Sequence, residues 1–210
     1  MSNRRIILST HNPGKLREIR QVLSSLPVRV VSLEDVCDLP EAPETGATFG
    51  ENARNKALYY ARATAQWCLA DDSGLQVDAL DGQPGVNSAR YARDRLAGNA
   101  DRAATDRANN DKLLAALKGV DDADRTARFI CHLALADPQR VLIETSDTLE
   151  GRIARAPAGY NGFGYDPLFY LPQLGCTVAQ LSTAEKNRIS HRGKAARKFA
   201  KLLEGFLDRL

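Results

Sequence analysis

The chain alternates short apolar runs with longer amphipathic segments, and no other feature of the sequence limits the fold as strongly. Residues 5–9 and 28–33 are short apolar runs typical of strands. Between them, residues 14–26 place apolar side chains on one face of a helix, namely Leu16, Ile19, Val22, Leu23 and Leu26. Strands that alternate with amphipathic helices are typical of the α/β class, in which helices cover a sheet.

Capping and turn residues extend this pattern along the chain. Thr48 and Glu51 form a capping box, which predicts a helix from there to about Gln66. Residues 67–70 are predicted to form a strand that ends on residues 71–74, with a separate strand over 75–77. The later predicted segments are helices over 101–118 and 193–210, a capping box at 182–185, and strands over 127–136, 140–145, 150–154 and 168–171, the first two joined by a hairpin turn. The order predicts a single domain over residues 1–210, with a mixed sheet flanked by helices and two lobes with a cleft.

Composition excludes several classes of protein. The chain has 210 residues, of which 43% are hydrophobic, and this is enough to bury a core without disulfides. No apolar run approaches the ~20 residues that span a bilayer, and the first is too short for a signal peptide, so we expect no membrane segment. Four scattered cysteines indicate a reduced, cytoplasmic environment. The net charge of +3 is too small to indicate nucleic-acid binding.

The segment from Ser9 to Lys15 lies between the first predicted strand and the first helix. Asn12 is a favoured helix cap and Pro13 a favoured first helical residue, so free backbone N–H groups point outward at this helix start. Such a helix start attracts phosphate, and Lys15 adds a mobile cation. The alternative is a well-capped helix with a surface lysine.

Two adjacent carboxylates, Asp71 and Asp72, follow the strand predicted over 67–70. Neighbouring residues of a strand point to opposite faces, so one carboxylate is expected to enter the cleft and the other to hold a backbone or cationic partner. One carboxylate with substrate phosphates is the usual way in which proteins hold Mg²⁺, and Glu41 or Glu44 of the acidic loop over 34–47 could supply a second ligand. The alternatives are a turn that ends a strand and a solvated acidic loop.

Two later segments carry groups suited to a base and to phosphates. Residues 162–167 combine glycines with aromatic rings, which allows close backbone approach and a flat wall for stacking. Residues 185–193 offer cationic or titratable groups, although they could also be a solvated turn between helices. The alternative for 162–167 is a tight turn with core aromatics, and the cations of the last helix are expected to form its solvated face. Taken together, the segments favour a nucleotide polyphosphate with Mg²⁺.

Six motifs, in order along nearly the whole chain, resemble those of the inosine triphosphate pyrophosphatase family, the dITP/XTP pyrophosphatases. They are Thr10–Lys15, Thr48–Ala53 with Lys56, Ala70–Leu75, Pro84–Gly85 with Ser88–Tyr91, Phe163–Pro167 and Ser190–Gly193. Any one motif is weak, but six in order are very specific. The chain departs from the family at His11, where the first loop usually has glycine.

The resemblance implies an elongated α/β fold with two lobes and a central substrate cleft, usually as a homodimer. It implies Mg²⁺-dependent hydrolysis of ITP, dITP and XTP to the monophosphate and pyrophosphate, which cleanses the nucleotide pool. Asp72 would bind Mg²⁺ and act as general base, and Glu41 matches a second metal ligand in some relatives. The residues implied to bind the substrate are Thr10, His11, Asn12, Pro13, Gly14 and Lys15 around the triphosphate, Lys56, Ser73 and Lys186 as further contacts, Phe163, Gly164, Tyr165 and Asp166 as the wall of the base, and His191 and Arg192 at its edge.

Two other functions compete with this interpretation. One is a pyrophosphatase for other nucleotides, such as modified pyrimidines, which would share the chemistry and differ in the base pocket. The other is a non-catalytic nucleotide or RNA binder that uses the basic last helix. Asp72 argues against a binder, because a protein that only binds polyanions gains nothing from a carboxylate in its cleft. Within the favoured function, Arg192 is expected to donate to the O6 oxygen of the base and to reject the amine of adenine.

Overall fold

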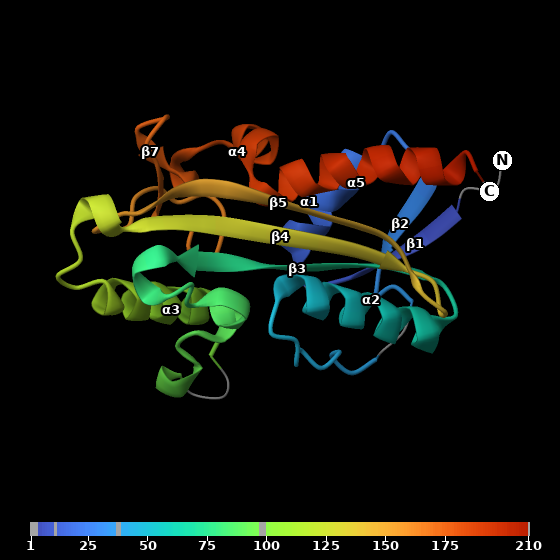
Figure 1. Cartoon of the computed structure of the whole chain (residues 1–210), viewed down its shortest axis with the longest axis horizontal. Helices are drawn as coiled ribbons and strands as arrows, with labels where there is room; N and C mark the ends of the chain where they lie inside the picture. The colour runs from blue at the N-terminus through green and yellow to red at the C-terminus, as the bar shows by residue number, and fades with distance from the viewer. Residues whose placement is uncertain (1–3, 11, 37–38, 97–99, 210) are drawn as a thin grey trace. The chain divides into compact units, whose positions relative to one another are not determined.

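The strands form one mixed sheet (Figure 1). The computed structural model describes residues 4–10, 12–36, 39–96 and 100–209. The sheet has seven strands in the order β2-β1-β3-β4-β5-β6-β7. Their bounds are Arg4–Ser9 (β1), Val28–Ser32 (β2), Trp67–Val77 (β3), Thr126–Ala136 (β4), Val141–Ile153 (β5), Phe169–Leu171 (β6) and Cys176–Thr177 (β7). Strand β1 pairs in parallel with β2 and β3, whereas β6 pairs antiparallel with β5 and β7, which confirms the predicted mixed sheet.

The helices begin at the capping residues that the sequence indicated. Asn12 caps α1, Thr48 and Glu51 form the capping box of α2, and Ser182 and Glu185 exchange the same two hydrogen bonds before α4. The helices are α1 (Pro13–Leu23), α2 (Phe49–Thr64), α3 (Arg102–Ala116), α4 (Thr183–Ile189) and α5 (His191–Leu207). Every helix in the described part of the chain is too short or too polar to cross a membrane.

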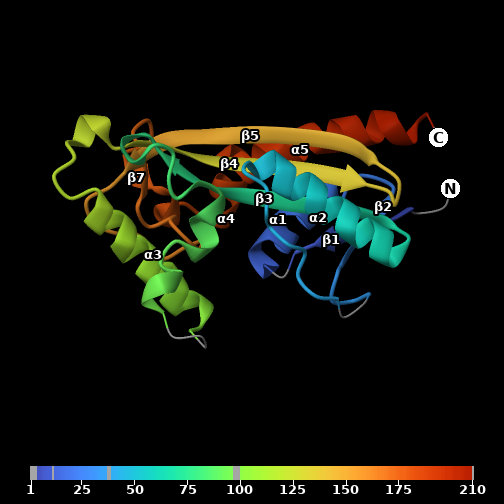
Figure 2. The same ribbon diagram turned by 60° about the horizontal axis from the view of Figure 1, so that its bottom comes forward.

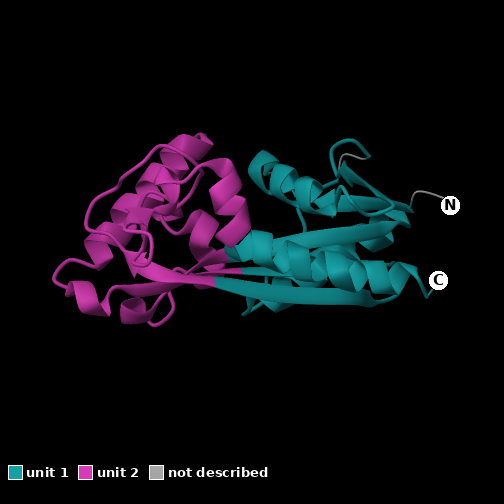
Figure 3. Cartoon of the chain, turned by 90° about the horizontal axis from the view of Figure 1, so that it is seen from above, with its two compact units in different colours: residues 1–73, 131–148, 190–210 teal, residues 74–130, 149–189 magenta. Residues whose placement is uncertain are grey.

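The chain divides into two compact units (Figure 3). Unit 1 comprises residues 1–73, 131–148 and 190–210, and unit 2 comprises residues 74–130 and 149–189. Strands β3, β4 and β5 each contribute residues to both units. Two units agree with the expectation of two lobes, while the cleft and the single domain stay predictions.

In unit 1, helices cover both faces of the strands (Figures 1 and 2). Ile6 and Leu8 of β1 pack with α1 and α5, whereas Ile7 between them packs with α2. The alternation follows from the strand repeat of two residues, which sends neighbouring side chains to opposite faces. The same alternation along β3 sorts the polar residues described below.

Unit 2 has a separate core built around the ends of β4, β5 and β6. The rings of Phe129 and Phe169 stack with their centroids 4.4 Å apart, and Leu113 of α3 and Leu117, which caps that helix, belong to the same cluster. Tyr165 belongs to the same core, so the loop over 159–167 is anchored to it.

The strand predicted to end at residues 71–74 does not end there. Strand β3 runs without a break from Trp67 to Val77, so Asp71 and Asp72 lie inside it and the separate strand over 75–77 is its continuation. Polar residues normally mark the end of a buried strand, but here ion pairs and hydrogen bonds satisfy Asp71 and Ser73 within the sheet. The strands predicted over 140–145 and 150–154 are likewise parts of β5.

Candidate functional site

The turn between β1 and α1 is shaped by its own side chains. Asn12 Oδ1 accepts from the backbone N–H of Gly14 at 2.9 Å and of Lys15 at 3.4 Å, and Thr10 Oγ1 accepts from Asn12 N–H at 3.1 Å. These bonds fix the first turn of α1 with Pro13 at its start, as predicted. The sequence predicted free N–H groups here, but Asn12 engages those of Gly14 and Lys15, so what remains to attract an anion at this helix start is the helix dipole. His11 lies outside the described residues.

Asp71 and Asp72 point to opposite faces of β3, as the alternation argument predicted. Asp71 lies on the face covered by α1 and α5, where its Oδ2 accepts from Cys131 Sγ at 3.3 Å. Asp72 lies on the face covered by α2, close to Asn52 and Lys56. The two carboxylates therefore have different partners and different chemistry.

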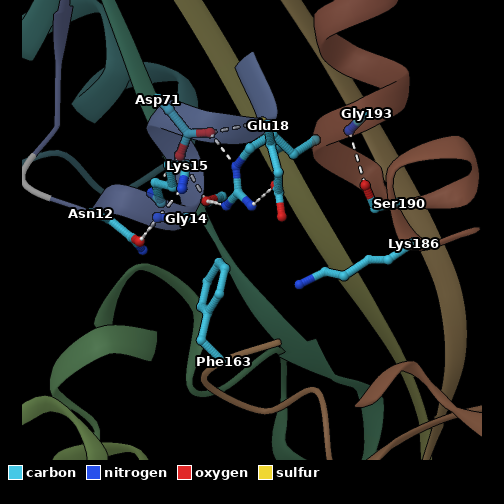
Figure 4. Close-up of polar contacts among 12 residues, drawn as sticks. Asn12, Gly14, Lys15, Glu18, Asp71, Phe163, Lys186, Ser190 and Gly193 are labelled. Carbon is cyan, nitrogen blue, oxygen red and sulfur yellow. Dashed lines mark hydrogen bonds and ion pairs between the residues drawn. The ribbon is translucent and has the colours of Figure 1, made fainter. Parts of the chain in front are cut away.

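Asp71 is held by two cations (Figure 4). Its carboxylate pairs with Lys15 Nζ, and Arg192 Nε lies 2.8 Å from its Oδ2. Ser73 Oγ donates to the other oxygen at 2.8 Å. Burial by itself raises the pKa of Asp71, but Arg192 and Lys15 outweigh it and hold that pKa far below its usual range. Asp71 is thus a permanent anion with the cationic partner expected for one of the pair.

Arg192 is surrounded by acceptors of unit 1. Besides Asp71, its guanidinium contacts Glu18 Oε2 at 2.7 Å and Ser73 Oγ at 2.8 Å. The residue is 2% exposed. Arg192 was expected at the edge of a base, and the structure instead shows each of its three nitrogens engaged by a residue of unit 1. Its role toward the substrate stays a prediction.

Asp72 has the opposite electrostatic setting. Burial raises the pKa of Asp72 to about 6, against the opposing effect of Lys15 and Lys56. Its Oδ2 is buried and has no hydrogen-bond partner among the described residues. A carboxylate that titrates near neutral pH and keeps one oxygen unsatisfied is suited to proton transfer or to a cation.

Glu44, rather than Glu41, lies beside Asp72. Glu44 Oε1 is 2.5 Å from Lys56 Nζ, and its charge raises the pKa of Asp72. Burial by itself lowers the pKa of Lys56, but the charges of Glu44, Asp72 and Asp71 outweigh it, so that the pKa of Lys56 is raised overall. Glu41 is exposed and lies near Tyr60 instead. The sequence left these two glutamates open as a second metal ligand, and the choice between them stays a prediction, although Glu44 is the one whose charge acts on Asp72.

The charged residues of unit 1 around Asp71 and Asp72 include more carboxylates than cations. Lys15, Lys56 and Arg192 face four carboxylates, those of Glu18, Glu44, Asp71 and Asp72. Within the described residues, no group of three or more potential metal ligands gathers. Mg²⁺ in nucleotide enzymes is usually held by one or two carboxylates with substrate phosphates and water. The donors around Asp72 fit that pattern.

In unit 2, the loop over 162–166 is held by a buried ion pair. Lys186 Nζ lies 2.6 Å from Asp166 Oδ2 and 4.4 Å from the centre of the Phe163 ring, toward which it points (Figure 4). The same Asp166 oxygen accepts from Phe163 N–H at 2.9 Å. Gly162 has a φ of +82°, and a Cβ there would lie 2.0 Å from this oxygen, so only glycine fits.

Helix α3 holds the other side of the same loop. Asp106 Oδ2 accepts from Gly164 N–H at 2.9 Å, and Asn110 Nδ2 donates to Gly164 C=O at 3.1 Å. Tyr165 is buried and donates to Ser88 C=O at 2.9 Å, which makes it a core residue. Phe163 is the half-buried ring of the loop and the one suited to stacking.

The structure thus brings the predicted residues together in two groups. Unit 1 holds those at the start of α1 together with the central and C-terminal ones, namely Thr10, Asn12, Pro13, Gly14, Lys15, Lys56, Asp72, Ser73, His191 and Arg192, and unit 2 holds Phe163, Gly164, Tyr165, Asp166 and Lys186. His191 and Arg192 begin α5 after the cap at Ser190. Sequence reasoning gave no role to Glu18, Asn52, Asp106 or Arg102. Two of them carried a signal, because Asn52 lies within the Thr48–Ala53 motif and Glu18 lies one helical turn after Lys15.

Comparison with known proteins adds an independent line of evidence. The Ham1 family model matches residues 6–202. A dITP/XTP pyrophosphatase of Geobacter sulfurreducens is 49% identical over 91% of this chain and 92% of its own, and one of Bacillus subtilis is 44% identical over 94% and 96%. The structure of a HAM1 protein from Coxiella burnetii superposes with a TM-score of 0.81 at 41% identity, covering 95% of this chain and 98% of that one.

Proposed function

Because the chain belongs to the Ham1 family, as its motifs predicted, we propose that it hydrolyses ITP, dITP and XTP to the monophosphate and pyrophosphate. This reaction removes deaminated purine nucleotides from the nucleotide pool. The relatives of nearly equal length are named for such an activity. The competing interpretation, a pyrophosphatase for modified pyrimidine nucleotides, would use the same chemistry with another base.

The single observation that carries a catalytic function is the setting of Asp72. Without a bound metal, its buried carboxylate has an unsatisfied oxygen and a pKa of about 6, so near neutral pH it can accept either a cation or a proton. A protein that only binds polyanions would gain nothing from this charge. A general base needs a pKa close to the working pH.

The chain's own residues support hydrolysis between the α and β phosphates. The first turn of α1, together with Lys15 and Lys56, binds the triphosphate, and Asp72 accepts a proton from the water that attacks the α phosphorus. The new bond joins the water oxygen to that phosphorus, and the bond to the bridging oxygen breaks as pyrophosphate leaves. Positioning and charge neutralisation supply most of the catalysis in phosphoryl transfer.

We propose Mg²⁺ as the cofactor, held by Asp72 with Glu44 near it. The unsatisfied oxygen of Asp72 offers a hard donor, which is the kind that Mg²⁺ prefers. The excess of carboxylates over cations also leaves unit 1 poorly suited to bind a polyanion alone. When bound, the ion would neutralise the leaving pyrophosphate.

The ring of Phe163 is proposed to stack on the purine base, with Lys186 and Asp166 keeping the loop in place. Stacking on an aromatic ring binds any flat base, so the ring gives affinity more than selectivity. Selectivity for keto purines must come from polar groups near the ring.

The test is a panel of nucleoside triphosphates assayed for monophosphate and pyrophosphate. We expect ITP, dITP and XTP to be hydrolysed far faster than ATP, with pyrophosphate rather than orthophosphate as the product. Faster turnover of modified pyrimidine nucleotides would favour the competing enzyme, and the absence of turnover despite tight nucleotide binding would favour a binding protein. Asp72→Asn is the matched inactive control.

We also propose a homodimer that acts on free nucleotides in the cytoplasm, as the family resemblance implies. The mass in solution, measured by sedimentation, should be twice that of the chain, and a monomer with full activity would contradict the dimer. Fractionation of the source cells should recover the protein in the cytoplasmic fraction, which contains the free nucleotides.

A further inference from the structure

Helix α3 brings a second cation to the ring that is proposed to stack on the base. The guanidinium carbon of Arg102 lies 5.2 Å from the centre of the Phe163 ring, and Lys186 Nζ lies 4.4 Å from it. All three residues belong to unit 2. Nothing in the motifs of the sequence pointed to Arg102.

The two cations differ in how firmly they are held. Lys186 is 6% exposed and makes a 2.6 Å ion pair with Asp166, so burial and pairing hold its ammonium group in place. The side chain of Arg102 is 55% exposed, and its Nε is 3.9 Å from Asp106 Oδ2. Asp106 is at the same time committed to Gly164 N–H at 2.9 Å. Arg102 therefore lies over the ring, with a long contact to Asp106, while its N–H donors stay accessible.

An arginine in this place has chemistry that distinguishes purines. Hypoxanthine and xanthine present the O6 and N7 acceptors on one edge, and arginine donates to such a pair in the commonest specific contact to a purine. Adenine has an amine in place of O6, so the same donors would face a donor. Arg192, which the sequence favoured for this task, has its nitrogens engaged by Asp71, Glu18 and Ser73.

We propose that Arg102 is a specificity-determining residue, which contacts the purine base at Phe163 and favours 6-keto purines over adenine. The inference rests on the proposed function, since it assumes that a nucleoside triphosphate is the substrate. Asp106 is a positioning residue in this arrangement, because it links Arg102 to the backbone of the Phe163 loop.

The experiment compares Arg102→Ala with the unmutated protein on ITP, XTP and ATP. We expect kcat/KM for ITP and XTP to fall by about five- to tenfold, mostly through KM, because an exposed arginine contributes at the low end of such contacts. ATP turnover should change little, so the ratio of ITP to ATP narrows. Arg102→Lys keeps the charge but loses the planar fork, and it should restore only part of the ratio.

Two controls separate the base from other effects. Arg107 is exposed on the same helix and makes no ion pair or ring contact with the described part of the chain, so Arg107→Ala should leave all three substrates unchanged. Inhibition by inorganic pyrophosphate, which has no base, should be the same for Arg102→Ala and the unmutated protein. A weaker inhibition would assign Arg102 to the phosphates and overturn the proposal.

The outcomes also separate this inference from the proposed function. If the unmutated protein hydrolyses none of the panel, the proposed function fails. If it hydrolyses ITP and Arg102→Ala keeps the same KM and ITP-to-ATP ratio, the inference about Arg102 alone fails. A lower KM in Arg102→Ala would show that the arginine competes with the base for the ring, which also refutes it.

Discussion

Replacing Asp72 by asparagine should make the protein more stable while it abolishes activity. Burial raises the pKa of Asp72 from 3.8 to about 6, so the folded protein binds a proton that the unfolded chain has already released between these values. The stabilisation that this proton gives the folded protein is therefore fully present below the pKa of Asp72 in the unfolded chain. It is lost as the pH rises through the pKa of Asp72 in the folded protein. At 1.36 kcal/mol per pKa unit, the ionised carboxylate costs about 3 kcal/mol near pH 8. Asparagine imitates the neutral form and removes this cost.

The measurement is urea unfolding, followed by the fluorescence of the single tryptophan, Trp67, with chelator present to exclude metal effects. Asp72→Asn should be more stable than the unmutated protein by up to about 3 kcal/mol near pH 8, and the difference should vanish near pH 4. Hydrolysis of ITP should fall by roughly 10²–10⁴-fold or more, because general base and metal ligand are lost together. Equal stability near pH 8, or a gap that widens on acidification, would refute the reasoning.

The neighbouring residue supplies the control of opposite sign. Asp71 is ionised and paired with Lys15 and Arg192, which hold its pKa far below the usual range. Asp71→Asn leaves the buried Arg192 and the partly exposed Lys15 with one fewer anion, so it should destabilise the protein by about 3–5 kcal/mol, as breaking buried pairs does. A stabilising Asp71→Asn would reverse the two assignments.

Three other perturbations follow from the same structure. Lys15→Ala should weaken ITP binding through a lost contact of roughly 1.5–3 kcal/mol. It should also lower the midpoint of thermal unfolding, because Asp71 loses a partner. An unchanged kcat/KM would show that Lys15 does not bind the substrate. Chelation should remove nearly all turnover and Mg²⁺ should restore it, and full activity in excess chelator would exclude the metal-assisted reaction. Gly162→Ala should raise KM for ITP and lower thermal stability, because its Cβ would meet Asp166 Oδ2 at 2.0 Å, whereas Gly164→Ala, which meets nothing within 4 Å, should cost only the strain of its positive φ. Equal effects of the two would argue against the clash.

Local patterns predicted much of the fold because they depend on residues close in sequence. Caps at Asn12 and Thr48 and the alternation along β3 are set by neighbours within a few positions, and all three were confirmed. The continuation of β3 through Asp71 could not be predicted, since its partners lie on other elements. Arg192 meets Glu18 across 174 residues of sequence, and no short spacing reports such a contact.

The candidate site shows the same limit. The motifs identified Asp72 and Lys56 by their residue types. They did not distinguish Glu44 from Glu41, because the direction of a side chain in an irregular loop does not follow from its position in the sequence. Arg102 was missed because its partner, Phe163, lies on a distant loop that touches α3 only in the folded protein.

The ion pairs around Asp71 also set the order in which the protein can be completed as it is synthesised. Lys15 and Asp71 leave the ribosome early, while Arg192 follows Asp71 by 121 residues. Until α5 docks, Lys15 is the one cation of this group that the nascent chain has in place for the carboxylates of Glu18 and Asp71. Burying both carboxylates also requires the charge of Arg192. The N-terminal strands can therefore pair before the last helix emerges, but the buried charges reach balance only after it does. Nascent chains that stop before Arg192 should expose the start of α1 to protease, and those that extend beyond α5 should protect it.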